Sequence, residues 1–226
     1  MFAIDFHTHT YHSYDSLMKP ARILQLAKER GLNGIVISDH NSIQGGLECA
    51  ALNKDSDFKV IVGSEVKTSV GDITGLNLKE EVTAYYFSEV IQQIKNQGGL
   101  VLLVHPFYSH RLNEINYSSI DLIEGYNARV PIGKNEQAIA LAKEHKIPFV
   151  AGSDAHLYNE IANCRTFFND MNTLLLPVKS EFKRNTFYSE VISQGIKVLK
   201  TRSGKNFYKW VKWAPVYLYK RAKEKS

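Results

Sequence analysis

The sequence predicts an α/β fold in which buried parallel strands alternate with amphipathic helices. Five short, mostly apolar runs end at or beside His, Asp or Glu, and they occupy residues 4–9, 34–40, 60–65, 100–105 and 149–156. Short β-branched runs of this kind are typical of strands buried on both faces of a parallel sheet. Repeated strand–helix units with short connections favour a parallel sheet, and a sufficient number of them favours a barrel.

The segments between these runs have apolar residues at helical spacing. In residues 20–30, Ile23, Leu24 and Leu26 share one face, and Gly31 follows as a typical helix terminator. The other elements are expected in this order: a helix at 43–52, strands within 60–78 with a break at 69–72, a helix at 87–96, a strand ending at 105, a loop through 116, a strand at 121–127, a helix at 134–146, a strand at 148–152 and a helix at about 180–194.

Length and composition narrow the class of protein. A chain of 226 residues is long enough for one α/β domain with a sizeable core. The two cysteines, Cys49 and Cys164, form neither a disulfide framework nor a metal-binding spacing, which suits a reducing compartment. Met1 leads almost directly into the first strand, and no apolar run is long enough to span a bilayer. We therefore expect a cytoplasmic protein, with peripheral membrane attachment as an option.

Two motifs place ligand-type side chains two residues apart at strand ends. His7 and His9 face the same side of an extended strand, as do Asp154 and His156. Either pair alone is more often a pair of surface residues. The carboxyl ends of parallel strands share one face, however, and chemistry is built there. Both pairs in one α/β chain therefore indicate a multinuclear metal site.

Five motifs, in order along residues 4–160, resemble one known family. They are Asp-Phe-His-Thr-His-Thr at 5–10, Ser-Asp-His-Asn at 38–41, Gly-Ser-Glu at 63–65, His-Pro at 105–106 and Gly-Ser-Asp-Ala-His at 152–156. Together they resemble the polymerase and histidinol phosphatase (PHP) domain superfamily. The resemblance implies a distorted (β/α)7 TIM-like barrel over residues 1–195. It also implies two or three divalent transition metals (zinc, manganese or iron) and hydrolysis of phosphate esters.

The resemblance also implies a ligand for each metal. The first metal would take His7, His9, Glu65 and Asp154, the second Glu65 and His105, and the third Asp15, His40 and His156. Members with three metals often offer a further His to the second metal after the strand that follows His105. Residues 124–127 read Glu-Gly-Tyr-Asn and contain no His. The second position is therefore expected to be weak, completed by water or filled by substrate.

The ligand types agree with hydrolysis of a phosphate ester. Imidazole and carboxylate suit Zn, Mn or Fe, and the absence of thiolate argues against a soft metal. Glu65 bridging two cations would help to generate a hydroxide for attack on phosphorus. The substrate is expected to be a small phosphate ester, and histidinol phosphate, a nucleotide and phosphotyrosine all remain open. The alternative is a non-catalytic, metal-stabilised domain recruited to a membrane or complex by its basic tail.

Three further residues could contribute to the site. Arg129 follows a strand end and could clamp phosphate bidentately, or it could be a solvated loop residue. His110 could act as a general acid, although an exposed loop histidine is the simpler interpretation. Asp72 is interpreted first as a turn residue and second as a pocket residue. His145, late in a helix, is interpreted as a surface residue near the helix C-terminus.

The C-terminal segment, residues 196–226, differs in composition from the rest of the chain. Residues 197–226 contain ten Lys or Arg and one acidic residue, a formal charge of +9, whereas residues 1–196 carry −4. A helix here would be amphipathic, with one aromatic and apolar face formed by Phe207, Trp210, Val211, Ala214, Tyr217 and Leu218. Pro215 is expected to kink or split it. Docking on the body or self-association, an anionic membrane surface and, less favoured, nucleic acid all remain open as partners.

Overall fold

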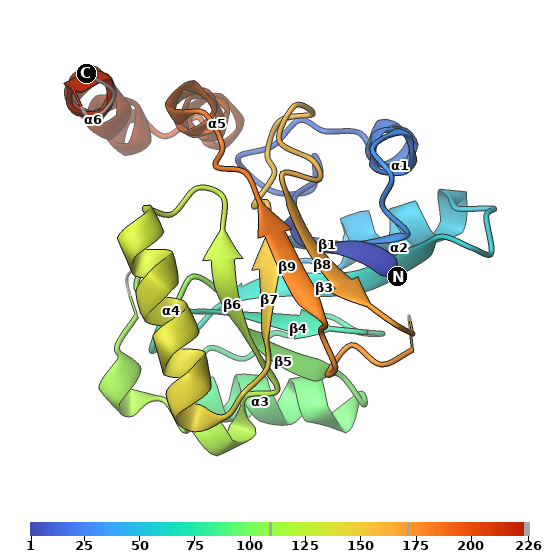
Figure 1. Cartoon of the computed structure of the whole chain (residues 1–226). Helices are drawn as coiled ribbons and strands as arrows, with labels where there is room; N and C mark the ends of the chain where they lie inside the picture. Colours follow the sequence, from blue (N-terminus) through green and yellow to red (C-terminus); the bar gives the residue numbers. More distant parts are fainter. Residues whose placement is uncertain (109, 171, 224–226) are drawn as a thin grey trace.

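A sheet of nine strands curls around one interior in the computed structural model, which describes residues 1–108, 110–170 and 172–223 (Figure 1). The strand order is β7-β6-β5-β4-β3-β2-β1-β8-β9. The strands are β1 (Phe2–Thr8), β2 (Gly34–His40), β3 (Lys59–Lys67), β4 (Asp72–Leu76), β5 (Leu100–Leu103), β6 (Leu122–Asn127), β7 (Phe149–Gly152), β8 (Cys164–Phe168) and β9 (Lys179–Phe182).

The sheet is parallel apart from two insertions. β1, β2 and β3 pair in parallel, as do β5, β6 and β7. β4 lies antiparallel between β3 and β5, and β8 lies antiparallel beside β1. Thr8 bridges to Ala155, just beyond β7, so the two sides of the sheet meet and the barrel nearly closes. The expected distorted α/β barrel is confirmed, with antiparallel strands interrupting the simple strand–helix alternation.

Helices pack on the outside of this sheet, except for the last two, which lie over one end of the barrel. They are α1 (Pro20–Glu29), α2 (Gln44–Leu52), α3 (Phe87–Asn96), α4 (Ile132–His145), α5 (Phe187–Thr201) and α6 (Gly204–Lys223), with short 3₁₀ turns at Leu112–Glu114 and Tyr117–Ser119. In α3, Phe87, Val90, Ile91 and Ile94 are the buried face. Burying each such side chain contributes about 1.5–3 kcal/mol, which fixes the helix against the sheet.

The barrel interior below the site is apolar. Each of the strands β1 to β7 contributes to one buried cluster, which contains Ile4, Phe6, Val36, Ile61, Leu76, Leu102, Leu122 and Val150. Side chains alternate across a strand, so every second residue along each strand continues on this inward face. The polar residues near the strand ends that continue this inward face therefore lie directly above an apolar interior, the floor of the site.

The prediction of a helix at about 180–194 was wrong about where the helix begins. Lys179–Phe182 is β9, paired antiparallel with β8, and the helix runs instead from Phe187 to Thr201. In β8, Cys164, Thr166 and Phe168 are buried while Arg165 and Phe167 are half-buried, which is the two-residue period of a strand. Neither β8 nor β9 was predicted, because both are short and β9 carries polar residues typical of an edge.

The two C-terminal helices lie side by side above the end of the barrel to which the β6 and β7 arrows point (Figure 1). α6 packs on α5: the Trp210 indole donates a hydrogen bond of 3.0 Å to the Val191 carbonyl, and Ala214 is buried. Phe207 and Val211 remain exposed. α6 is not split at Pro215.

The predicted border between residues 195 and 196 falls within α5, and residues 224–226 of the tail lie outside the described residues. Across the described ranges, no helix has the length and apolar character that crossing a bilayer requires.

Candidate metal centre

All eight predicted metal ligands meet at the end of the barrel covered by α5. His7 lies in β1, His40 ends β2 and Glu65 lies in β3. His105 follows β5, and Asp154 and His156 follow β7. His9 and Asp15 belong to the segment that leaves β1. Five segments far apart in sequence therefore supply one cluster, as the shared strand ends predicted.

The two-residue period of the strands explains how several of these side chains reach the interior. Counting in steps of two, the inward face of β2 leads from Val36 to His40, that of β3 from Ile61 to Glu65, and that of β6 from Leu122 to Glu124. β4 runs in the opposite direction, so its inward face leads from Leu76 back to Asp72. The register of β1 against β2 shifts between Asp5 and Thr8. This irregularity lets Phe6 and His7, adjacent in sequence, both contribute to the interior.

Glu65 occupies the centre of the cluster. Its Oε2 lies 3.1 Å from His40 Nδ1, 3.2 Å from His7 Nε2 and 3.5 Å from His9 Nε2. Its Oε1 lies 3.0 Å from His105 Nε2. The two oxygens therefore face different sets of imidazoles, which is the arrangement that a carboxylate bridging two cations requires.

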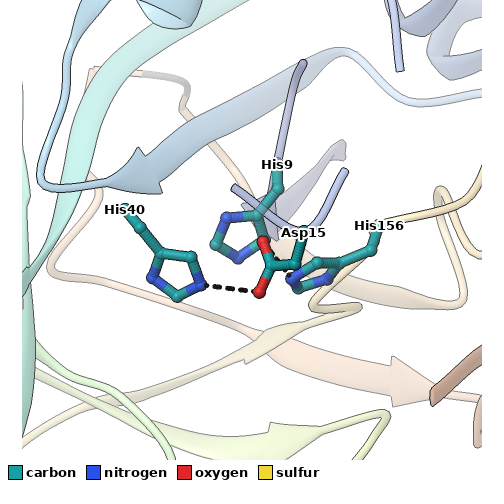
Figure 2. A group of neighbouring side chains, drawn as sticks. All are labelled: His9, Asp15, His40 and His156. Carbon is teal, nitrogen blue, oxygen red and sulfur yellow. Dashed lines mark ion pairs between the residues drawn. The ribbon is translucent and has the colours of Figure 1, made fainter. Parts of the chain in front are cut away.

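A second group gathers around Asp15. Figure 2 shows His40 and His156 on either side of its carboxylate, with His9 behind. Asp15 Oδ2 lies 3.3 Å from His40 Nε2, and Oδ1 lies 3.3 Å from His156 Nε2. Ligand atoms of His9, Asp15, His40 and His156 all lie within 4.8 Å of one another. These four residues include the three predicted for the third metal.

Asp154 connects the first metal position to this group. Its Oδ1 lies 3.4 Å from His9 Nε2, 3.8 Å from His7 Nε2 and 3.3 Å from His156 Nδ1. The residues predicted for the first metal, His7, His9, Glu65 and Asp154, are thus in mutual contact.

Two buried atoms show that this donor set suits a divalent cation. Within the described chain, His9 Nε2 and Asp15 Oδ1 make no hydrogen bond, although Asp154 Oδ1 lies 3.4 Å from the first and His156 Nε2 lies 3.3 Å from the second. The other nitrogen of His9 lies 3.0 Å from the Ser13 hydroxyl. A buried polar atom without a partner costs about 1–3 kcal/mol. A cation between these atoms would remove that cost, and imidazole with carboxylate is the donor mixture that Zn, Mn and Fe accept.

Mutual electrostatics hold the carboxylates ionised. Burial by itself would raise the pKa of Glu65, but the His40 and His7 imidazoles outweigh it and hold this pKa well below its usual range. The pKa values of Asp15 and Asp154 are likewise low. Burial and the neighbouring His156 lower the pKa of His9 to about 3, which leaves the neutral imidazole that a metal ligand must be.

Glu124 and Asn127, which the sequence analysis did not select, support the ligands from β6. Glu124 Oε1 lies 3.0 Å from His7 Nδ1, and its Oε2 accepts hydrogen bonds from the His105 backbone N–H and the Asn127 amide. Carboxylates behind a metal-binding histidine fix its tautomer and orientation. A carboxylate inside an apolar strand was the signal that could have identified Glu124.

The segment carrying His9 and Asp15 is held from two sides. Asp39 accepts hydrogen bonds from the Thr10 backbone N–H (2.6 Å), the Thr10 hydroxyl and the Ser13 hydroxyl. From α5, Lys200 Nζ donates to the backbone carbonyls of Tyr11, Ser13 and Ser16. The end of α5 therefore holds the segment that carries two predicted ligands, His9 and Asp15.

Backbone strain coincides with two predicted ligands. His105 has φ of 30° and Asp154 has φ of 50°, in the left-handed region that residues with a Cβ rarely adopt. Such conformations persist where the surroundings impose them, and they cluster at functional sites.

Arg129 and His110 are placed differently from the other predicted residues. Arg129 lines the edge of the cavity, and its guanidinium donates to Glu160 at 2.9 Å and to the Ser193 hydroxyl at 2.8 Å. No described residue partners its Nε. His110 contacts the backbone carbonyls of Asp72 at 2.8 Å and Tyr108 at 3.0 Å. Their phosphate-clamping and general-acid roles stay predictions.

A cavity of about 170 Å³ opens onto the cluster. Predicted ligands Asp15, His40, Glu65, His105, Asp154 and His156 line it, together with Asp72, Arg129 and three α5 residues, Glu190, Gln194 and Lys197. A larger cavity of about 820 Å³ lies between α5 and α6, and it shares Tyr108, Glu190, Gln194 and Lys197 with the smaller one. The predicted ligands therefore open, on the α5 side, toward this larger cavity, called the vestibule below.

Known proteins resemble this chain in sequence and in fold. The Methanocaldococcus jannaschii protein named Uncharacterized protein MJ1587 is 33% identical over 140 residues, which cover 54% of this chain and 82% of that protein. A two-domain protein of Bacteroides vulgatus, containing a predicted PHP-like metal-dependent phosphoesterase, superposes with a TM-score of 0.59 at 19% identity, over 69% of this chain and 52% of that one. This chain thus spans about half of that protein.

A further solved structure, PsfC from Pseudomonas syringae, superposes with a TM-score of 0.61 at 15% identity. The match covers 89% of this chain and 98% of that one. A family model described as the PHP domain matches residues 5–194, which include every predicted ligand. The chain belongs to the PHP domain family.

Proposed function

We propose that this protein is a metal-dependent phosphoesterase that hydrolyses a small phosphate ester in the cavity above Glu65. The observation that carries the proposal is the position of Glu65, whose two oxygens face separate sets of imidazoles. Divalent cations held by these residues would supply an activated water and neutralise the phosphoryl oxygens. The family membership and the phosphoesterase-like fold support the same reaction class.

The charges that line the cavity explain why hydrolysis would depend on cations. Five carboxylates face it, those of Asp15, Glu65, Asp72, Asp154 and Glu190. Without cations, this negative charge would repel a phosphate dianion. The chain's own contribution is to hold the donors in fixed positions above an apolar floor, so that little reorganisation is needed during the reaction.

Residues at the rim could orient the ester. Lys197 lies on α5 with its Nζ 4.3 Å from the Tyr14 ring centroid, and both residues line the cavity. A lysine here offers a mobile positive charge to a phosphate oxygen. Arg129 could contribute through its unpartnered Nε, although Glu160 and Ser193 already hold the rest of its guanidinium. The vestibule between α5 and α6 leaves room for the leaving group.

Hydrolysis of a panel of phosphate esters by metal-loaded and metal-free protein tests this proposal. The panel should include an aryl phosphate, histidinol phosphate, nucleoside monophosphates and phosphotyrosine, each with Mn²⁺, Zn²⁺ or Fe²⁺. We expect turnover of at least one ester, loss of that turnover on chelation and its return when metal is restored.

A metal-binding protein that hydrolyses none of these esters would favour the alternative function, in which the metals are structural. In that case chelation should lower the melting temperature without any change in hydrolysis. The choice among ester substrates rests on the relative kcat/KM values across the panel.

A further inference from the structure

Asp72 lies close enough to Glu65 and His105 to be the third ligand of a cation that these two residues hold. Ligand atoms of Glu65, Asp72 and His105 lie within 4.8 Å of one another, and all three residues line the same cavity. The position matters because residues 124–127, at the end of β6, supply no histidine. Glu124, which occupies that segment, is already engaged by His7, His105 and Asn127.

The reversed direction of β4 brings Asp72 to this place. β4 pairs antiparallel with β3, so its first residue lies at the end where the parallel strands finish. Thr74 pairs directly with Glu65, and directly paired residues share a face of the sheet. Asp72, two residues from Thr74, is on that face too, diagonal to Glu65. From sequence alone the same residue reads as part of a turn.

The surroundings of Asp72 lack the partners that a structural carboxylate usually has. Among the residues that the structure describes, none donates a hydrogen bond to its carboxylate, and the contact with His110 is made by the Asp72 backbone carbonyl. It is half-buried and near the negative charge of Glu65, and the His105, His40 and His110 imidazoles offset part of that repulsion. Two carboxylates at this separation repel one another unless a cation lies between them.

His105 adds an independent observation. Its Nε2 lies 3.0 Å from Glu65 Oε1, while its Nδ1 is buried with no partner among the described residues. The residue also adopts a positive φ, so its ring is held in place at a backbone cost. An imidazole whose Nε2 faces the Glu65 carboxylate is placed to share a cation with it.

We propose that Asp72, Glu65 and His105 together form a second cation position, with Asp72 as the ligand that completes it. Two carboxylates and one imidazole favour Mn²⁺, Fe²⁺ or Zn²⁺. The proposal rests on the cation-binding part of the proposed function and is independent of hydrolysis. A protein that binds a cation pair but cleaves no ester would overturn the phosphoesterase assignment and leave this one standing.

The test measures Mn²⁺ binding to the full chain without substrate. Wild type, Asp72→Asn, Asp72→Glu and the control Asp57→Asn are titrated with Mn²⁺, with total metal read by elemental analysis and spin coupling read by EPR. Asp57 is an exposed loop aspartate, so its variant makes the same chemical change away from the site. Because the Asp72 carboxylate accepts no hydrogen bond within the described chain, Asp72→Asn removes charge without breaking an internal contact.

We expect wild type and Asp57→Asn to bind a cation pair that shows an exchange-coupled Mn²⁺ signal. Asp72→Asn should bind its last cation at least about ten-fold more weakly, since even partners behind a ligand are worth that much. Asp72→Asn should also lose the exchange-coupled signal. Asp72→Glu should recover part of the Mn²⁺ affinity and part of the coupled signal. Wild-type stoichiometry, affinity and coupling in folded Asp72→Asn would overturn the proposal, as would a wild type without a coupled pair.

Discussion

Glu124 Oε1 lies 3.0 Å from His7 Nδ1, and the other nitrogen of the same ring lies 3.2 Å from Glu65 Oε2. The His7 imidazole is thus held between a supporting carboxylate on β6 and a predicted ligand on β3. With Nδ1 occupied by Glu124, Nε2 is the atom that faces the metal position.

Replacing Glu124 with Gln should therefore weaken cation binding without unfolding the barrel. The amide oxygen can still accept from His7, but its NH2 group cannot accept from the His105 N–H and Asn127, and the negative charge that favours the bound state is lost. Loss of such supporting partners lowers metal affinity by about 10–100-fold. Calorimetric titration of metal-free protein with Zn²⁺ or Mn²⁺ measures the change, and unchanged affinity would show that Glu124 has no supporting role.

Lys200 links α5 to the ligand loop through three backbone carbonyls. Lys200→Met keeps most of the aliphatic stem and removes the donors, so the loop with Asp15 should be less well held. We expect cation affinity at the Asp15 group to fall by about five-fold, since one hydrogen bond contributes roughly 1 kcal/mol. Lys205→Met, an exposed site on α6, is the matched control. Equal affinities in the two variants would contradict this prediction.

The main contribution of the buried ion pair between Arg129 and Glu160 should be to the free energy of unfolding. Glu160 also accepts hydrogen bonds from the backbone N–H groups of His156 and Leu157, so it anchors the segment that carries a predicted ligand. Glu160→Gln would remove the carboxylate that pairs directly with the buried Arg129 guanidinium and leave the charges of Asp154 and Glu190 to act on it without that pair. Breaking a buried pair in this way costs about 3–5 kcal/mol of unfolding free energy. Urea denaturation of both proteins measures it, and a loss below about 1 kcal/mol would contradict the assigned role.

Ending the chain after Gly204 should leave metal content unchanged but lower the melting temperature. The predicted ligands all lie before this point, whereas removal of α6 uncovers the surface of α5 that Trp210 and Ala214 cover. Metal analysis and a thermal melt test both parts. A folded, truncated protein that has lost its metals would show that α6 contributes to the centre.

The same pair of proteins tests the partner of the basic tail. If α6 binds anionic lipid, cosedimentation with phosphatidylserine vesicles should be lost on truncation and weakened by salt, because exposed charges are screened within about 10 Å at 0.1 M.

Motifs at the strand ends made much of this site predictable from sequence. Side chains alternate between the two faces of a strand, and parallel strands finish at the same end of the barrel, so both rules indicate where a side chain points. His40 and Glu65 follow directly from that rule, whereas His7 reaches the same cluster through the irregular register of β1. Asp72 does not, because its place depends on β4 running against its neighbours, and a single sequence carries no signal for strand direction. Glu124 was missed since its partner His7 is distant in sequence. β9 was read as helix, since the pairing that defines it is also non-local.

Turnover of an aryl phosphate by wild type and Glu65→Gln, with metal content measured on the same samples, tests the central claim most directly. His145→Ala, at an exposed residue stacked on Tyr117, is the control. We predict that wild type and the control carry at least two transition-metal ions per chain and lose turnover on chelation. Glu65→Gln should lose at least about 100-fold in kcat, because a charge between the cations is removed. Near-normal turnover in fully metal-loaded Glu65→Gln, or less than one ion in wild type grown with Zn, Mn and Fe, would contradict the account.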